Sequence, residues 1–125
     1  MLRALHEAKL SPAAINFINA HGTATENNDE TESGAMLRLF DQPPLFASTK
    51  GNTGHTLGAA GAVEAVYSIL NLHNGEVYPG INFSTPIEST GLTPVLQFTQ
   101  HSMNHIMSNS FGFGGNCTSL IFSRS

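Results

Sequence analysis

Two stretches of the chain repeat the same order of local signals: a β-favouring run, a loop of small residues and then a helical pattern. The first run covers residues 15–19 and leads to a predicted helix at 28–41. The second covers residues 45–48 and leads to a predicted helix at 56–73. Strand–loop–helix units of this kind build layered α/β domains, in which helices cover a sheet. This repeated order constrains the fold class more than any other feature of the sequence.

The other segments add a helix end, a long connection and a terminal hairpin. Residues 2–9 are helical in pattern, and three prolines between residues 79 and 100 indicate an extended, loop-rich connection. β-favouring runs at 106–110 and 118–122 flank a glycine loop at 111–115. With 125 residues, the chain is predicted to form one layered α/β domain with a mixed sheet covered by helices.

Each of the two long helices is predicted to have an apolar face. Carboxylates, Asp29 among them, crowd the first turn of the 28–41 helix, where the helix dipole favours anions. Its apolar positions are Ala35, Met36, Leu39 and Phe40. In the 56–73 helix, an apolar stripe is expected to face the core; it comprises Ala59, Ala62, Val63, Val66, Ile69 and Leu70.

Composition excludes several classes of protein. Charged residues make up 11% and hydrophobic residues 40%, which argues against disorder and predicts a large face buried against something else. The net charge is −4 and the five lysines and arginines are scattered, so a nucleic-acid-binding patch is not expected. No apolar run approaches the ~20 residues that span a bilayer, and no signal peptide is evident. The single Cys117 allows no internal disulfide, and we expect a reducing, cytoplasmic setting.

Two histidines follow the first two predicted strands. His21 and His55 lie 34 positions apart, each in a small-residue loop, so both are expected to reach one pocket. Imidazoles donate and accept protons near neutral pH, and two together suit the binding of an oxyanion or a decarboxylation. No suitable nucleophile accompanies them, because Cys117 precedes a β-run where a small buried thiol is expected. The abrupt helical start of the chain indicates a piece of a longer protein, and we therefore expect half of an active site.

Three motifs in this order resemble the C-terminal half of a β-ketoacyl-acyl carrier protein synthase, a ketosynthase with the thiolase-like fold. They run from His21 to Asp29, from Lys50 to Gly61 and from Asn109 to Asn116. The resemblance extends from about residue 13 to 122. One departure is Ala24, where glycine is common in the family. The other is the family's acyl-accepting cysteine, which belongs to an N-terminal half absent from this chain, and Cys117 does not match it.

The resemblance implies roles for five residues in a decarboxylative condensation. His21 and His55 would stabilise the enolate that forms when a malonyl thioester loses CO2, and one such preorganised donor contributes about 3 kcal/mol. Lys50 would support charge, with Glu64 as its ion-pair partner and Asp29 as a further supporting residue. A buried Glu64 would need a cation, whereas the alternative is an exposed carboxylate on the outer helix face.

The same resemblance implies substrate contacts. Thr23 and Thr25 would hydrogen-bond the pantetheine arm of a carrier protein, although ordinary turn chemistry also explains them. Asn52 and Asn109 are weaker candidates, because ordinary loop hydrogen bonds explain them about as well. Phe111 and Phe113 lie among glycines, and Phe113 would gate the acyl site; the alternative is that both rings fill the core. No metal and no cofactor are expected, because phosphopantetheine arrives on the carrier protein.

The expected partners are an acyl carrier protein, the N-terminal ketosynthase half and, in the full-length protein, a second subunit. We expect the isolated chain to be inactive and either self-associating or only marginally stable. Two alternatives stay open. In the first, the parent protein would be a non-catalytic partner subunit of the chain-length-factor type. In the second, the chain would be a short stand-alone binding fragment. Retention of both histidines and the lysine favours the enzyme, but fatty acid, aryl polyene and polyketide pathways are not distinguished.

Overall fold

A four-stranded mixed sheet forms the centre of the computed structural model, which describes all residues Met1–Ser125. Its strands are β1 (Phe17–Asn19), β2 (Leu45–Ala47), β5 (His105–Gly112) and β6 (Asn116–Ser123). They lie in the order β2-β1-β5-β6. Strand β1 is parallel to both β2 and β5, whereas β6 returns antiparallel to β5. The predicted mixed sheet and terminal hairpin are confirmed.

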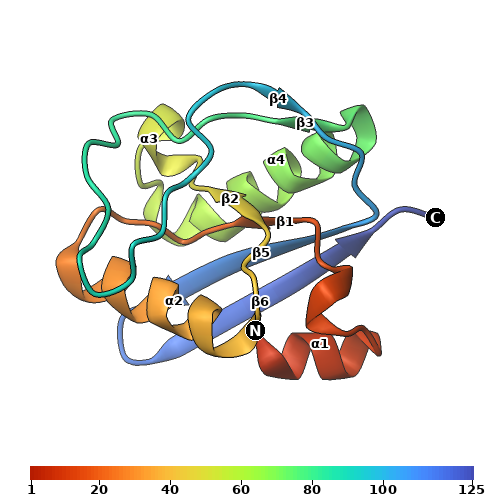
Figure 1. The fold of residues 1–125 in the computed structure, drawn as a ribbon, viewed down its shortest axis with the longest axis horizontal. Coiled ribbons are helices and arrows are strands. Elements are labelled where there is room, and N and C mark those ends of the chain that lie inside the picture. The colour runs from red at the N-terminus through yellow and green to blue at the C-terminus, as the bar shows by residue number, and fades with distance from the viewer.

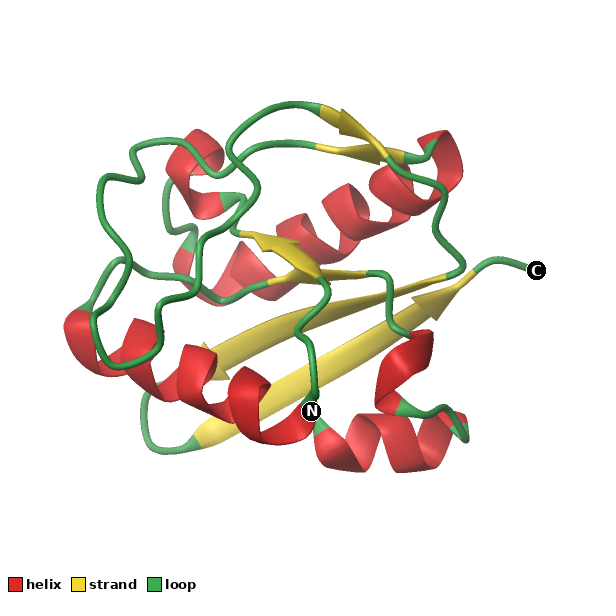
Figure 2. Ribbon diagram, in the orientation of Figure 1, coloured by secondary structure: helices red, strands yellow, loops and turns green.

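Helices cover both faces of this sheet (Figures 1 and 2). They are α1 (Leu2–Ala8), α2 (Glu26–Leu39), the short α3 (Lys50–Thr53) and α4 (Ala60–Asn74), with 3-10 turns η1 (Pro12–Ala14) and η2 (Leu57–Ala59). The first two helices lie on one face and α4 lies on the other. None of the helices combines the length and the apolar character that crossing a bilayer requires.

Several element boundaries differ from the sequence prediction. The helix predicted at 28–41 begins at Glu26, because Thr25 is extended and serves as the N-cap residue. The helix predicted at 56–73 is divided into η2 and α4, and Leu57, the first residue of η2, has a left-handed backbone with φ of 51°. The connection predicted at 79–100 ends in β4 (Thr99–Gln100), which pairs antiparallel with β3 (Glu76–Val77).

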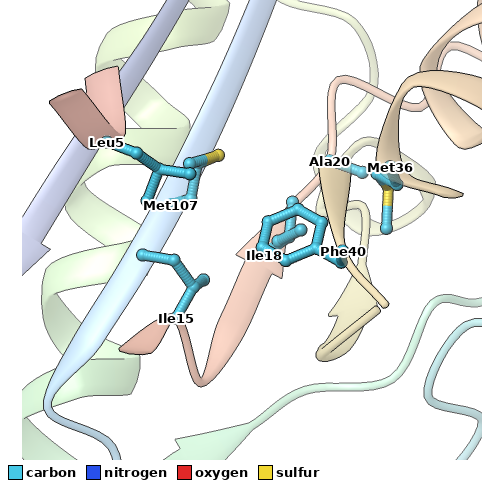
Figure 3. Close-up of a cluster of buried hydrophobic side chains, with 7 residues drawn as sticks. All are labelled: Leu5, Ile15, Ile18, Ala20, Met36, Phe40 and Met107. Atoms are coloured by element: carbon cyan, nitrogen blue, oxygen red, sulfur yellow. The ribbon is translucent and has the colours of Figure 1, made fainter. Parts of the chain in front are cut away.

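The apolar core is divided between the two faces of the sheet. The cluster on the face of α1 and α2 is shown in Figure 3 and consists of Leu5, Ile15, Ile18, Ala20, Met36, Phe40 and Met107. On the face of α4, the buried cluster consists of Phe17, Ala47, Leu72, Val77, Met103 and Ile106. Alternate residues of β1 and β5 therefore supply both layers, as expected for a sheet covered on each side.

Helix α4 turns a polar face inward, which contradicts the predicted apolar stripe. Its buried residues are Ala60, Glu64, Ser68, Asn71 and Leu72. The inner polar groups bond to the sheet: Asn19 donates to the backbone oxygen of Glu64 and to the Ser68 hydroxyl. The apolar residues Val66, Ile69 and Leu70 are exposed instead. The prediction was wrong because hydrogen bonds and an ion pair, rather than apolar burial, orient this helix.

Candidate active site

The two histidine loops meet because they follow adjacent parallel strands. Strand β1 ends at Asn19 and β2 at Ala47, and these residues are paired in register, so the chain leaves both strands at the same edge of the sheet. The ring centroids of His21 and His55 are 5.7 Å apart, with the ring planes at 90°. The convergence expected from the sequence is thus present. Two imidazoles at this separation can both reach one bound oxygen atom.

Lys50 links His21 to Glu64 beneath this pair. The lysine side chain is buried, with 8% of Lys50 exposed, and its Nζ forms an ion pair with Glu64, of which 2% is exposed. The same Nζ donates to the backbone oxygen of His21 and lies 3.2 Å from His21 Nδ1. The predicted Lys50–Glu64 pair is therefore present in the structure. An unpaired carboxylate at this depth would be strongly unfavourable.

The surroundings of His21 favour a neutral ring with its proton on Nε2. An ammonium group only donates, so Nδ1 of His21 must act as the acceptor toward Lys50. The pKa of His21 is lowered from 6.5 to about 4, first by burial and then by the charges of Lys50 and His55, while Asp29 opposes the shift. Nε2–H of His21 is thus available as a hydrogen-bond donor at neutral pH.

His55 is held in the same tautomer by a different group. The backbone N–H of Leu57 donates to His55 Nδ1 over 3.1 Å. His55 is exposed at the surface of the chain, and its neutral form carries the proton on Nε2. Both rings can therefore donate from Nε2.

Glu32 is a site residue that the sequence interpretation missed. Its Oε1 accepts the backbone N–H of His21 and its Oε2 accepts that of Gly22, each over 3.0 Å. Burial raises the pKa of Glu32, and hydrogen bonds from the backbone oppose this rise. In the sequence, Glu32 reads as one more carboxylate near the acidic start of its helix. Its spacing of four residues from the buried Met36 places it on the inner face, and that signal could have identified it.

The predicted polar residues around the first loop are close to His21. Asp29 accepts the backbone N–H of Thr23 over 3.1 Å, and the hydroxyls of Thr23 and Thr25 are 2.8 Å apart. Between them, Ala24 has a φ of 60°, a conformation that favours glycine. The departure at Ala24 therefore matters more than the sequence indicates. A hollow of about 380 Å3 beside this loop is lined by Thr23, Asp29, Lys50 and His55, among others.

The aromatic and amide candidates differ in their placement. The ring centroid of Phe111 is 5.5 Å from that of His21, whereas Phe113 is fully exposed on the turn between β5 and β6. Asn52 lines a different cavity, of about 260 Å3, in whose lining neither histidine takes part. The buried position expected for Cys117 is wrong, since its thiol is free and exposed. It is the second residue of the edge strand β6.

Groups that could bind a metal do not gather in the structure. No set of three or more histidine, cysteine, aspartate or glutamate side chains is placed to hold an ion. The arrangement instead combines two Nε2 donors, a buried cation beside one of the two rings and a carboxylate that anchors the loop. Such a set suits the stabilisation of negative charge that develops on a substrate oxygen.

Comparison with known proteins gives a consistent family. A family model described as "Beta-ketoacyl synthase, C-terminal domain" matches residues 1–84. The mitochondrial 3-oxoacyl-acyl-carrier-protein synthase of Arabidopsis thaliana is 42% identical over 129 residues, covering 98% of this chain and 28% of the relative. 3-Oxoacyl-acyl-carrier-protein synthase 1 of Escherichia coli K12 is 43% identical, with 86% of this chain and 27% of the relative covered.

Solved structures agree over nearly the whole chain. A β-ketoacyl synthase from Burkholderia phymatum superposes with a TM-score of 0.93 and 38% identity, covering 100% of this chain and 31% of that protein. The ishigamide ketosynthase/chain length factor gives a TM-score of 0.94 and 32% identity, covering 99% of this chain and 31% of its own. The chain thus spans less than a third of the length of the relatives it matches.

Proposed function

Because the chain belongs to the β-ketoacyl synthase family, as a C-terminal domain with the thiolase-like fold, we propose that it supplies half of a condensing site. The reaction is the decarboxylative condensation of an acyl thioester with a malonyl group carried by acyl carrier protein. In this site His21 and His55 are catalytic, and the charge of Lys50 adds to the effect of burial in keeping His21 neutral. The observation that carries the proposal is the convergence of the two imidazoles over the buried Lys50–Glu64 pair.

The chemistry follows from where charge develops. When the malonyl carboxylate leaves as CO2, the electron pair of the broken C–C bond moves onto the thioester, and its oxygen becomes negative. Two Nε2–H donors directed at that oxygen lower the barrier, by about 3 kcal/mol for each preorganised donor. The resulting carbanion equivalent then attacks the acyl thioester, and the new C–C bond displaces the thiolate that carried the acyl group.

The acyl-bearing nucleophile is assigned to a part of the synthase outside this chain. Cys117, the single cysteine, is exposed on the edge strand, paired in register with Phe111 rather than placed between the histidines. The phosphopantetheine arm would enter along Thr23 and Thr25, with Phe113 at the entrance. One solved neighbour, with 31% identity, is a type II polyketide acyl-carrier protein in complex with its ketosynthase. No resident cofactor is needed for this chemistry.

A non-catalytic role remains as a second candidate, since one neighbour includes a chain length factor. A subunit of that kind would have no need for the two converging imidazoles and the buried lysine. The presence of all three therefore favours the enzyme.

The test is a chain-swapped synthase. The matched C-terminal segment of the Escherichia coli synthase 1 is replaced by this chain, and CO2 release and 3-oxoacyl product are measured with acyl and malonyl carrier substrates. We expect condensation that His21→Ala or His55→Ala each lowers by about a hundredfold, whereas Ser123→Ala on the far end of β6 leaves it unchanged. Unaltered activity in both histidine variants, or product formation by the isolated chain alone, would refute the proposal.

A further inference from the structure

A line of hydrogen bonds connects the edge strand β6 with the His21 loop. The hydroxyl of Ser119 donates to Asn109 Oδ1 over 2.7 Å, and Asn109 Nδ2 donates to Glu32 Oε1 over 3.0 Å. Glu32 in turn accepts the backbone N–H groups of His21 and Gly22. The β5–β6 hairpin and the distant helix α2 thereby act together on the backbone of one histidine.

The polarity of the Asn109 amide is decided by its two neighbours. A carboxylate accepts and does not donate, so the NH2 end of Asn109 must face Glu32. The carbonyl end then faces the Ser119 hydroxyl, which lies directly opposite in the β5–β6 register. A flipped amide would place its oxygen against the carboxylate and leave the hydroxyl donor without its acceptor. Ser119 thus fixes the orientation that allows Asn109 to support Glu32.

Burial gives this arrangement its energetic weight. Asn109 is completely buried and Glu32 is 4% exposed, so neither can exchange its protein partner for water. Three donors converge on the Glu32 carboxylate, and each offsets part of its desolvation. Loss of the Asn109 donor would leave the carboxylate less stable and loosen its hold on both backbone groups.

We propose that Asn109 and Ser119 are positioning residues for His21, acting through Glu32. The catalytic meaning of this inference rests on the proposed function, in which His21 donates to the developing enolate. The same hairpin carries Phe111, whose ring packs near His21. The strand pair that presents the aromatic side chains and the loop that presents the imidazole are therefore held in one geometry by a single carboxylate.

Amide hydrogen exchange in the isolated chain tests this directly. The N–H groups of His21 and Gly22 are the donors to Glu32, while the N–H of Ala20 donates to Ala47 O and is the internal reference. We expect Ser119→Ala to accelerate exchange at His21 and Gly22 about tenfold, the effect of losing one supporting hydrogen bond. Exchange at Ala20 should keep its rate, and the NMR signals of the His21 ring should move.

Three further variants sharpen the test. Asn109→Asp keeps the shape but places a second carboxylate beside Glu32, and it should accelerate both amides more than Ser119→Ala does. Ser119→Thr keeps the hydroxyl and should restore the parental rates. Ser123 lies on the same face of β6 as Ser119, and its hydroxyl bonds to His105 instead. Ser123→Ala should therefore leave the exchange rates of both the His21 and the Gly22 amide unchanged.

Two results would overturn the inference. One is parental exchange at His21 and Gly22 in Ser119→Ala; the other is equal acceleration at Ala20, which would indicate general destabilisation. If Asn109→Asp does not fold, Ser119→Ala and Ser119→Thr still test the inference. Ser119 is only half-buried, so substitutions there are expected to leave the chain folded. Both readouts are made without substrate, so failure of the condensation assay and failure of the positioning inference are distinguishable.

Discussion

Substitution of Lys50 by methionine probes the buried ion pair at the base of the site. Methionine retains most of the apolar stem and removes the ammonium group that pairs with Glu64. The carboxylate, with 2% of Glu64 exposed, would then keep only the Ser110 hydroxyl at 3.3 Å as a side-chain donor. Breaking a buried ion pair costs about 3–5 kcal/mol. Because the Ser110 hydroxyl still donates to the carboxylate, we expect a loss of unfolding free energy at the lower end of this range, about 3 kcal/mol.

The assay is urea unfolding of the isolated chain, followed by circular dichroism at one low protein concentration. Lys50→Met should lower the unfolding free energy by about 3 kcal/mol, a large share of the 5–15 kcal/mol typical of a domain. Adding Glu64→Gln should recover at least half of that loss, because no uncompensated charge remains buried. Lys9→Met, at an exposed position at the end of α1, should stay within about 0.5 kcal/mol of the parent.

The refuting results are specific. A Lys50→Met chain as stable as the Lys9→Met control would show that the pair is not buried as described. A double variant no more stable than Lys50→Met alone would show that the unpaired carboxylate is not the source of the loss.

Three further outcomes are expected. Because the pKa of His21 is lowered to about 4 in the folded chain, the unfolded chain binds more protons between pH 6.5 and 4. The unfolding free energy should therefore fall as the pH falls through this range. In urea titrations, His21→Asn should make the unfolding free energy depend less steeply on pH. Ala24→Gly should raise the unfolding free energy by about 0.5–1 kcal/mol, since it relieves the left-handed conformation at the cost of backbone entropy, and an unchanged or lower value in urea would contradict this. Val66 is 57% exposed on the uncharged outer face of α4, and Val66→Glu should reduce self-association measured by sedimentation. The control Leu37→Glu changes a residue of α2 that is 43% exposed and should leave self-association unchanged. Equal effects of the two variants would count against α4 as the associating surface.

The layered fold and the meeting of the histidines were predictable because both depend on local sequence. Strand runs at residues 15–19 and 45–48 each lead into a small-residue loop, and the structure pairs them in parallel. Parallel neighbours end at the same edge, so residues after each strand must come together. Lys50 and His55 both follow β2 and so lie near this edge, although the predicted loop contains the short helix α3, which begins at Lys50.

Other features depended on contacts between distant residues. The inward polar face of α4 reflects bonds from Asn19 and Lys50 to Glu64 and Ser68, which no periodicity of apolar residues predicts. Glu32 belongs to the site because the backbone N–H groups of His21 and Gly22 donate to its carboxylate on the inner face of α2.

The amino-acid sequence by itself determined the order of strands, loops and helices, and with it the residues that could reach one site. Only the tertiary structure decided which groups are desolvated together. Burial makes hydrogen bonds and ion pairs decisive, because a polar group removed from water must find its partner in the protein. That requirement orients the polar face of α4 toward the sheet and favours a neutral His21 beside Lys50. It also connects Ser119, more than 90 positions later in the chain, to the loop of His21 through Asn109 and Glu32.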